Sequence, residues 1–212
     1  MGQTKISIAI NEHIYLALFT RDAAGIACDG IGNIPPLHCV TKGDPVAPLI
    51  GDPLSLEIEW VGWWESIVNR RIDSINDRSA SNSYWLIQDE LETIRIYSEL
   101  ERLQQLINRY ADLSRFSLQG WRDGADFNFS DPLGKVKSVV ADGISSSLSD
   151  PLVSFDHPGQ LIELTLDIVP SNTIWISAPA SGYLIATTQS FERPNPWLSY
   201  LIGQSTRITR TN

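Results

Sequence analysis

The side chains best suited to nucleophilic or metal chemistry in this chain are three histidines and two cysteines. His38 and Cys39 are adjacent and could supply two metal ligands, but a zinc site needs three or four ligands and no second pair is present. A Cys39 nucleophile needs a base and an orienting group beside it, and sequence spacing alone places neither His13 nor His157 there. We therefore expect no metal and no cofactor. An enzyme working through Cys39 stays open as an alternative.

Two groups of acidic residues have spacings that could also do chemistry. Glu57 and Glu59 lie two apart in an alternating run, so in a strand they would project from one face. Paired carboxylates about 5–10 Å apart can hydrolyse glycosides, although the solvated face of a half-buried strand is a commoner place for such a pair. Residues 126–131 resemble a calcium loop but lack its turn glycine, and Lys137 replaces its final glutamate. A turn stabilised by its own polar side chains is the preferred interpretation of 126–131, with a weak calcium site as the alternative. The Glu57/Glu59 pair is kept within the enzyme alternative.

The basic residues favour contact with other proteins over catalysis. Twelve of the 16 basic residues are arginine, which pairs with carboxylates through two parallel hydrogen bonds and is enriched at interfaces. Arg95, Arg102 and Arg109 recur every seven residues and so form one stripe along a helix. The alternative is a solvated helix face on which these arginines pair with Glu99 or Glu101. We take the stripe as a candidate interface.

Seven tryptophans are many for 212 residues. Trp60 and Trp64 are expected in the core, because they belong to apolar periodic runs. Trp121 and Trp197 stand among Gly, Arg, Asn and Pro, which is typical of loops, and there they could anchor a protein partner or a sugar. A carbohydrate-binding module that uses these loop tryptophans is therefore a second alternative.

The charge balance excludes some partners and suggests others. The formal net charge is −9, from 25 acidic and 16 basic residues, so the body of the protein is a poor ligand for nucleic acid or an anionic membrane. Arg207 and Arg210 make the end of the chain basic, which suits docking onto the acidic surface of a neighbouring subunit. Apolar runs are too short for a membrane span or a signal peptide. We expect a protein made in the cytoplasm.

The elements that must position these residues are read from apolar periodicity. Residues 5–20 indicate one or two strands, and 54–61 alternate as a half-buried strand. Helices are expected at about 64–76 and, as one long helix, at about 84–117. The long helix changes its apolar face near Ile96, and its later stripe runs through Leu103, Leu106/Ile107, Tyr110 and Leu113. Further strands are expected at 161–169, 173–177 and 182–188, with one more strand or an arm at 204–211.

These elements predict an α+β fold, in which antiparallel, β-rich N- and C-terminal regions flank a central helical segment with one long helix. We expect a single unit over 1–212 that is β-rich over 1–62, helical over 63–118, and loop-rich and then β-rich over 119–212. Four Asp-Pro pairs are expected to stiffen turns.

The missing catalytic motifs, the two-sided helix and the arginine stripe together favour a non-enzymatic subunit of a larger complex. We expect other protein subunits as partners, in a homo-oligomer or a hetero-assembly. The most concrete version is a bacteriophage virion component of the tail, baseplate or neck.

Overall fold

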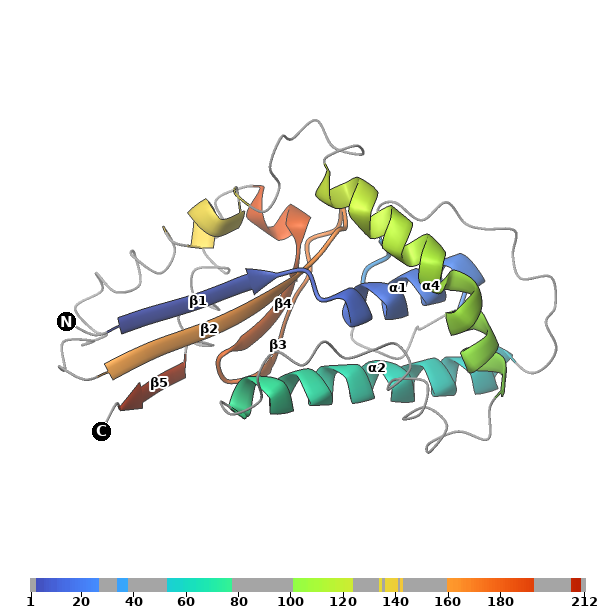
Figure 1. Ribbon diagram of the computed structural model, residues 1–212, viewed down its shortest axis with the longest axis horizontal. Helices are drawn as coiled ribbons and strands as arrows, with labels where there is room; N and C mark the ends of the chain where they lie inside the picture. Colours follow the sequence, from blue (N-terminus) through green and yellow to red (C-terminus); the bar gives the residue numbers. More distant parts are fainter. Residues whose placement is uncertain are drawn as a thin grey trace. The chain divides into compact units, whose positions relative to one another are not determined.

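The computed structural model describes residues 3–26, 34–37, 53–77, 101–123, 134, 136–140, 142, 160–192 and 207–210. Their fold class is α+β, as predicted. Contacts divide the chain into two compact units, a β unit of Met1–Ile10 with Phe127–Asn212 and a helical unit of Asn11–Asp126. The elements in chain order (Figure 1) are β1 (Gln3–Ala9), α1 (Glu12–Ala24), α2 (Pro53–Asn76), α4 (Glu101–Arg122), β2 (Gln160–Val169), β3 (Ile176–Ala180), β4 (Tyr183–Thr187), the 3-10 helix η1 (Thr188–Phe191) and β5 (Arg207–Arg210).

The sheet of the β unit mixes parallel and antiparallel pairs. β1 and β4 both run parallel to β2, while β3 pairs antiparallel with β4 and β5 pairs antiparallel with β2. The expectation of antiparallel strands is therefore wrong for β1–β2 and β2–β4. Parallel neighbours need a long crossover, and the chain between Ala9 and Gln160 supplies one for β1 and β2. The short turn with Gly182 at φ 79° permits only the predicted antiparallel pairing of β3 with β4.

The core of the β unit lies along β2 and β4. Every residue of β4 is buried, and so are residues 166–169 of β2. Continuous burial is typical of central strands with both faces covered. One polar pair interrupts it: the Tyr183 hydroxyl donates to Oδ2 of Asp167 at 2.9 Å, and both residues are fully buried. A buried carboxyl needs such a donor, because leaving it without hydrogen bonds costs free energy.

The helix α1 replaces the strand expected within residues 5–20. Asn11 caps its start, accepting hydrogen bonds from the backbone N–H groups of His13 (3.0 Å) and Ile14 (3.2 Å) through its side chain. Gly25 ends it in the left-handed conformation at φ 68°. Residues 14–21 are all buried, so this helix is apolar on every side and has no amphipathic period to distinguish it from a buried strand.

The helix α2 also corrects the prediction, because residues 54–61 are helical and not a strand. Pro53 opens the helix, a position that proline favours because its missing N–H has no partner there. Trp60, Trp63, Trp64 and Ile67 form its buried face, at the spacing of one side of a helix. Ile58 is 64% exposed, because it lies two residues before the buried Trp60 and two residues turn a helix by about 200°. The confirmed part of the prediction is the helix at 64–76 and the burial of Trp60 and Trp64.

The helix α4 confirms the later part of the predicted long helix and extends it to Arg122. The earlier part, residues 78–100, lies outside the described residues, and so does the predicted change of face. Leu103, Leu106, Ile107 and Tyr110 are buried as expected. The predicted stripe then fails at Leu113, which is 55% exposed. After Tyr110 the buried face continues instead in steps of four, four and three residues, through Ser114, Leu118 and Trp121.

The three helices form one core in which α1 contacts both α2 and α4. The indole N–H of Trp60 on α2 donates to the Ala17 carbonyl at 2.8 Å, and the Trp60 and Trp64 rings stack at 5.7 Å. On the other side of α1, the hydroxyls of Tyr15 and Ser117 are 2.8 Å apart. The predicted β-rich region 1–62 is thus wrong for two segments, because α1 and most of α2's first half belong to this helical core.

Candidate functional site

The predicted interface residues fall on two elements and on undescribed parts of the chain. Arg102, Arg109 and Trp121 lie on α4, while Arg207 and Arg210 lie on β5. In the register of β5 with β2, Arg207 is level with Glu163 and Arg210 with Gln160. Arg95 and Trp197 lie outside the described residues, as do His38, Cys39 and residues 126–131. The helix α4 is therefore the element on which the predicted surface can be compared with the structure.

Trp121 is not a loop anchor. It lies in the last turn of α4 and is fully buried, on the same face as Leu118 and Ser114. The glycine before it suggested the end of the helix, but Gly120 is a helical residue at which an added Cβ would meet no atom within 4 Å. A buried indole cannot stack on a sugar, so Trp121 drops out of the proposed carbohydrate site.

The exposed face of α4 carries two large apolar side chains. Phe116 is 82% exposed and Leu113 is 55% exposed, although both lie within a regular helix. Arg109 is exposed on the same face, because seven residues turn a helix through nearly two full turns. An exposed aromatic side chain and an exposed arginine on one helix face are residue types that protein interfaces favour. Sequence reasoning missed Phe116 because it lies outside the apolar stripe.

The two described arginines of the predicted stripe differ in their surroundings. The Arg109 guanidinium lies over the ring of Tyr110, its neighbour in sequence, at 5.6 Å from the centroid. That contact orients the cation while leaving the side chain exposed. Arg102 is only half-exposed, and its charge acts on Glu59 of α2. Arg109 is therefore the arginine of this pair that faces outward.

The Glu57/Glu59 pair does not have the geometry that the enzyme alternative needs. Both residues lie on α2, where positions two apart point in nearly opposite directions. Both carboxylate oxygens of Glu59 are shielded from solvent and accept no hydrogen bond from the residues that the structure describes. Burial raises the pKa of the Glu59 carboxyl above 4.5, and the positive charge of Arg102 acts in the opposite direction. The predicted common face of the two carboxylates is therefore wrong.

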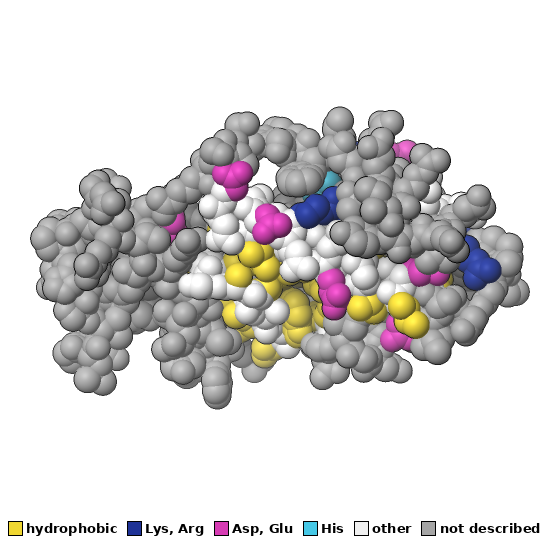
Figure 2. Space-filling view, turned by 90° about the horizontal axis from the view of Figure 1, so that it is seen from below, with side chains coloured by type: hydrophobic (Ala, Val, Ile, Leu, Met, Phe, Trp, Pro, Cys, Tyr) yellow, Lys and Arg dark blue, Asp and Glu magenta, His cyan; other side chains and the backbone are white. Residues whose placement is uncertain are grey.

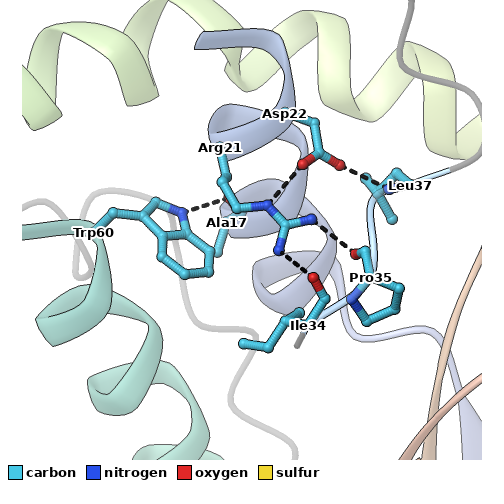
Figure 3. A network of polar contacts seen from close by, with 7 residues as sticks. All are labelled: Ala17, Arg21, Asp22, Ile34, Pro35, Leu37 and Trp60. Atoms are coloured by element: carbon cyan, nitrogen blue, oxygen red, sulfur yellow. Dashed lines mark hydrogen bonds and ion pairs between the residues drawn. The ribbon is translucent and has the colours of Figure 1, made fainter. Parts of the chain in front are cut away.

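A buried ionic network stands at the centre of the helical unit (Figure 3). Arg21 of α1 donates through Nε to Asp22 at 2.6 Å and through its two terminal nitrogens to the carbonyls of Ile34 (3.1 Å) and Pro35 (2.8 Å). The other Asp22 oxygen accepts from the Leu37 N–H at 2.7 Å. All of these groups therefore hold residues 34–37 against α1, and the network is structural.

The other face of Arg21 lies against α2. Its guanidinium is 5.5 Å from the centroid of the Trp60 ring, and Figure 3 shows the indole beside the arginine. A cation on an aromatic face is most favourable where water is excluded, and Arg21 is only 4% exposed. The arginine thus links α1, α2 and residues 34–37. Sequence reasoning missed it because no local motif marks a buried arginine.

A cluster of hydroxyls lies in the β unit, where β4 ends. The Thr187 hydroxyl donates to the Thr173 carbonyl at 2.6 Å and accepts from the Trp175 N–H at 3.0 Å. The Ser190 hydroxyl lies 2.9 Å from it and donates to the Trp175 carbonyl. The carboxyl ends of parallel strands commonly bind ligands. Here the bonds of Thr187 and Ser190 tie Thr173 and Trp175 to the end of β4, and neither hydroxyl bonds to an acid or base among the described residues.

The described residues contain no group of three or more His, Cys, Asp or Glu side chains placed to hold a metal ion. Their helices include none with both the length and the apolar character to cross a bilayer. On the face viewed in Figure 2, hydrophobic side chains are visible among acidic ones. Comparison with protein-family models, curated proteins and solved structures found no match for this chain.

Proposed function

We propose that this protein is a non-enzymatic subunit of a protein assembly and that it works by binding other protein subunits. The observation that carries the proposal is the exposed face of α4, on which Phe116 is 82% and Leu113 55% exposed. Scattered single apolar residues are normal on a surface, but two on adjacent turns of a regular helix form a patch. Burying a phenylalanine side chain is worth about 1.5–3 kcal/mol.

The charges around this patch support binding to protein. Arg109 lies on the exposed face with Phe116, and arginine is enriched among the residues that dominate binding energy. The net charge of −9 disfavours nucleic acid and anionic membranes as partners. A virion component of the tail, baseplate or neck is the narrower form of the proposal, and it rests on the character of the sequence alone.

The test is the mass of the purified full chain in solution. Sedimentation velocity from about 1 to about 100 μM should show a defined oligomer or a concentration-dependent mass. Native mass spectrometry of the complex purified from its source should show the chain at fixed stoichiometry with other subunits. A single monomeric species in both measurements would contradict the proposal.

A further inference from the structure

One line along α4 carries three residues with a regular spacing. Arg109, Phe116 and Asp123 are seven residues apart, and all three are exposed. Seven residues turn a helix by about 700°, which is only about 20° short of two full turns. Asp123 follows the last helical residue, but its N–H still donates to the Gln119 carbonyl at 2.9 Å, so it continues the same line. The backbone positions of Arg109 and Asp123 are therefore about 21 Å apart along the helix axis, with Phe116 midway.

The charges along this line, positive at Arg109 and negative at Asp123, match those of a second copy of the helix that runs in the opposite direction. If two copies of α4 lie antiparallel with the two-fold axis at Phe116, residue 109 of one copy is level with residue 123 of the other. Each Arg109 then meets an Asp123, and the two Phe116 rings meet at the centre. Such a contact is isologous and closes as a dimer. Resting on the proposed function, we propose that the exposed face of α4 binds the same face of a second copy of this chain.

The neighbouring residues fit this arrangement. Leu113 of one copy comes level with Gln119 and Gly120 of the other, and an added Cβ at Gly120 would meet no atom within 4 Å. The missing side chain leaves room for Leu113 beside the two Phe116 rings. A parallel pair would instead bring Arg109 next to Arg109 and Asp123 next to Asp123. Charge complementarity therefore selects the antiparallel pair.

The expected affinity is modest. One helix from each partner buries less than the 1,200–2,000 Å² of a standard interface, and two exposed ion pairs add little to the burial of Phe116 and Leu113. The net charge of −9 on each copy also opposes association at low salt. We expect dissociation constants in the micromolar range, so that several such contacts would be needed in a stable assembly.

The test is a charge exchange that only an antiparallel pair can rescue. Arg109→Asp leaves two acidic groups on the line and Asp123→Arg leaves two basic ones, so each variant alone should dimerise roughly 10- to 50-fold more weakly than the wild type. An equimolar mixture of the two variants restores both attractive pairs. It should form a heterodimer with an affinity close to that of the wild type, measured by sedimentation equilibrium of the full chain.

Two further variants separate the contact from general effects. Arg115→Asp changes the net charge as Arg109→Asp does, but Arg115 lies about 120° away around α4, so it should leave dimerisation within about threefold. Phe116→Ala should weaken dimerisation at least about 100-fold, with the thermal unfolding midpoint unchanged because the side chain is exposed.

The outcomes distinguish this inference from the proposed function. If an oligomer forms and all four variants leave it unchanged, the α4 contact is wrong while the proposed function stands. If each charge variant weakens the dimer and the mixture does not recover it, the antiparallel pairing is wrong, and Phe116 is covered by another part of the chain or by a different partner. A wild-type chain that stays monomeric up to about 100 μM, alone and with other subunits, contradicts both.

Discussion

Replacing Arg21 with alanine should destabilise the helical unit more than any change of a surface charge. Arg21 and Asp22 form an ion pair at 2.6 Å whose side chains are 5% and 13% exposed. The arginine also donates to the carbonyls of Ile34 and Pro35 and lies over the Trp60 ring. Its removal leaves two carbonyls and one shielded carboxylate without these donors.

The size of the effect follows from that count. Removing one partner of a buried ion pair costs about 3–5 kcal/mol, because the remaining charge stays away from water. The contact with the Trp60 ring is worth about 2 kcal/mol when water is excluded, but contributions within one network do not add. We therefore expect Arg21→Ala to lower the free energy of unfolding by about 3–5 kcal/mol. Arg21→Lys keeps the charge but not the planar fork, and should lower it by about 1.5–3 kcal/mol.

Arg115 on α4 provides a matched control. It pairs with Asp112 at 3.4 Å, and the two side chains are 58% and 96% exposed. Solvent screens such a pair, so Arg115→Ala should cost no more than about 0.5 kcal/mol. Urea unfolding followed by tryptophan fluorescence reports on this region directly, because Trp60 lies against Arg21. If the free energies of unfolding of Arg21→Ala and Arg115→Ala differ by less than about 1 kcal/mol, the Arg21 network does not hold the helical unit together.

Two further predictions concern α2 and the end of α1. Because burial raises the pKa of Glu59 above 4.5 and Arg102 only partly opposes this, its stabilising contribution is complete below pH 4.5 and is lost as the pH rises through the folded pKa. The free energy of unfolding of Glu59→Gln, measured relative to the wild type by urea unfolding, should therefore increase with pH from about 4 to 7. Glu65→Gln, at an exposed position of the same helix, serves as the control. A difference between Glu59→Gln and the wild type that does not change with pH would refute the raised pKa of Glu59. Gly25→Ala should destabilise by about 1 kcal/mol, because φ is 68° there, and Gly62→Ala inside α2 should stabilise by about 0.5–1 kcal/mol. The thermal unfolding midpoint should therefore fall for Gly25→Ala and rise for Gly62→Ala, and shifts of the same sign would contradict these two predictions.

Several features follow from the sequence because they depend on local order along the chain. The periodic run around Trp60 and Trp64 predicts their burial, and the structure confirms it. The apolar run 161–169 predicts a strand, and the turn expected at 179–182 predicts an antiparallel pair of strands on either side of it. The first of these strands is displaced from the expected 173–177 to Ile176–Ala180. The α+β class follows from these elements. Asn11 caps α1 and Gly25 ends it, but the continuous apolar run between them has no amphipathic period that would distinguish a buried helix from a buried strand.

Other features depend on what covers each element, which the local sequence does not specify. The parallel pairing of β1 with β2 depends on a crossover longer than any sequence window. On α4, helical spacing after Tyr110 allows either Leu113 or Ser114 to continue the buried face. Only the packing of α4 against α1 shows that Ser114 is buried and Leu113 faces outward. On the same helix Phe116 is exposed while Trp121 is buried. Periodicity determines which side chains gain from leaving water, whereas the partner that excludes the water is a property of the tertiary structure, because it comes from residues far away in the chain.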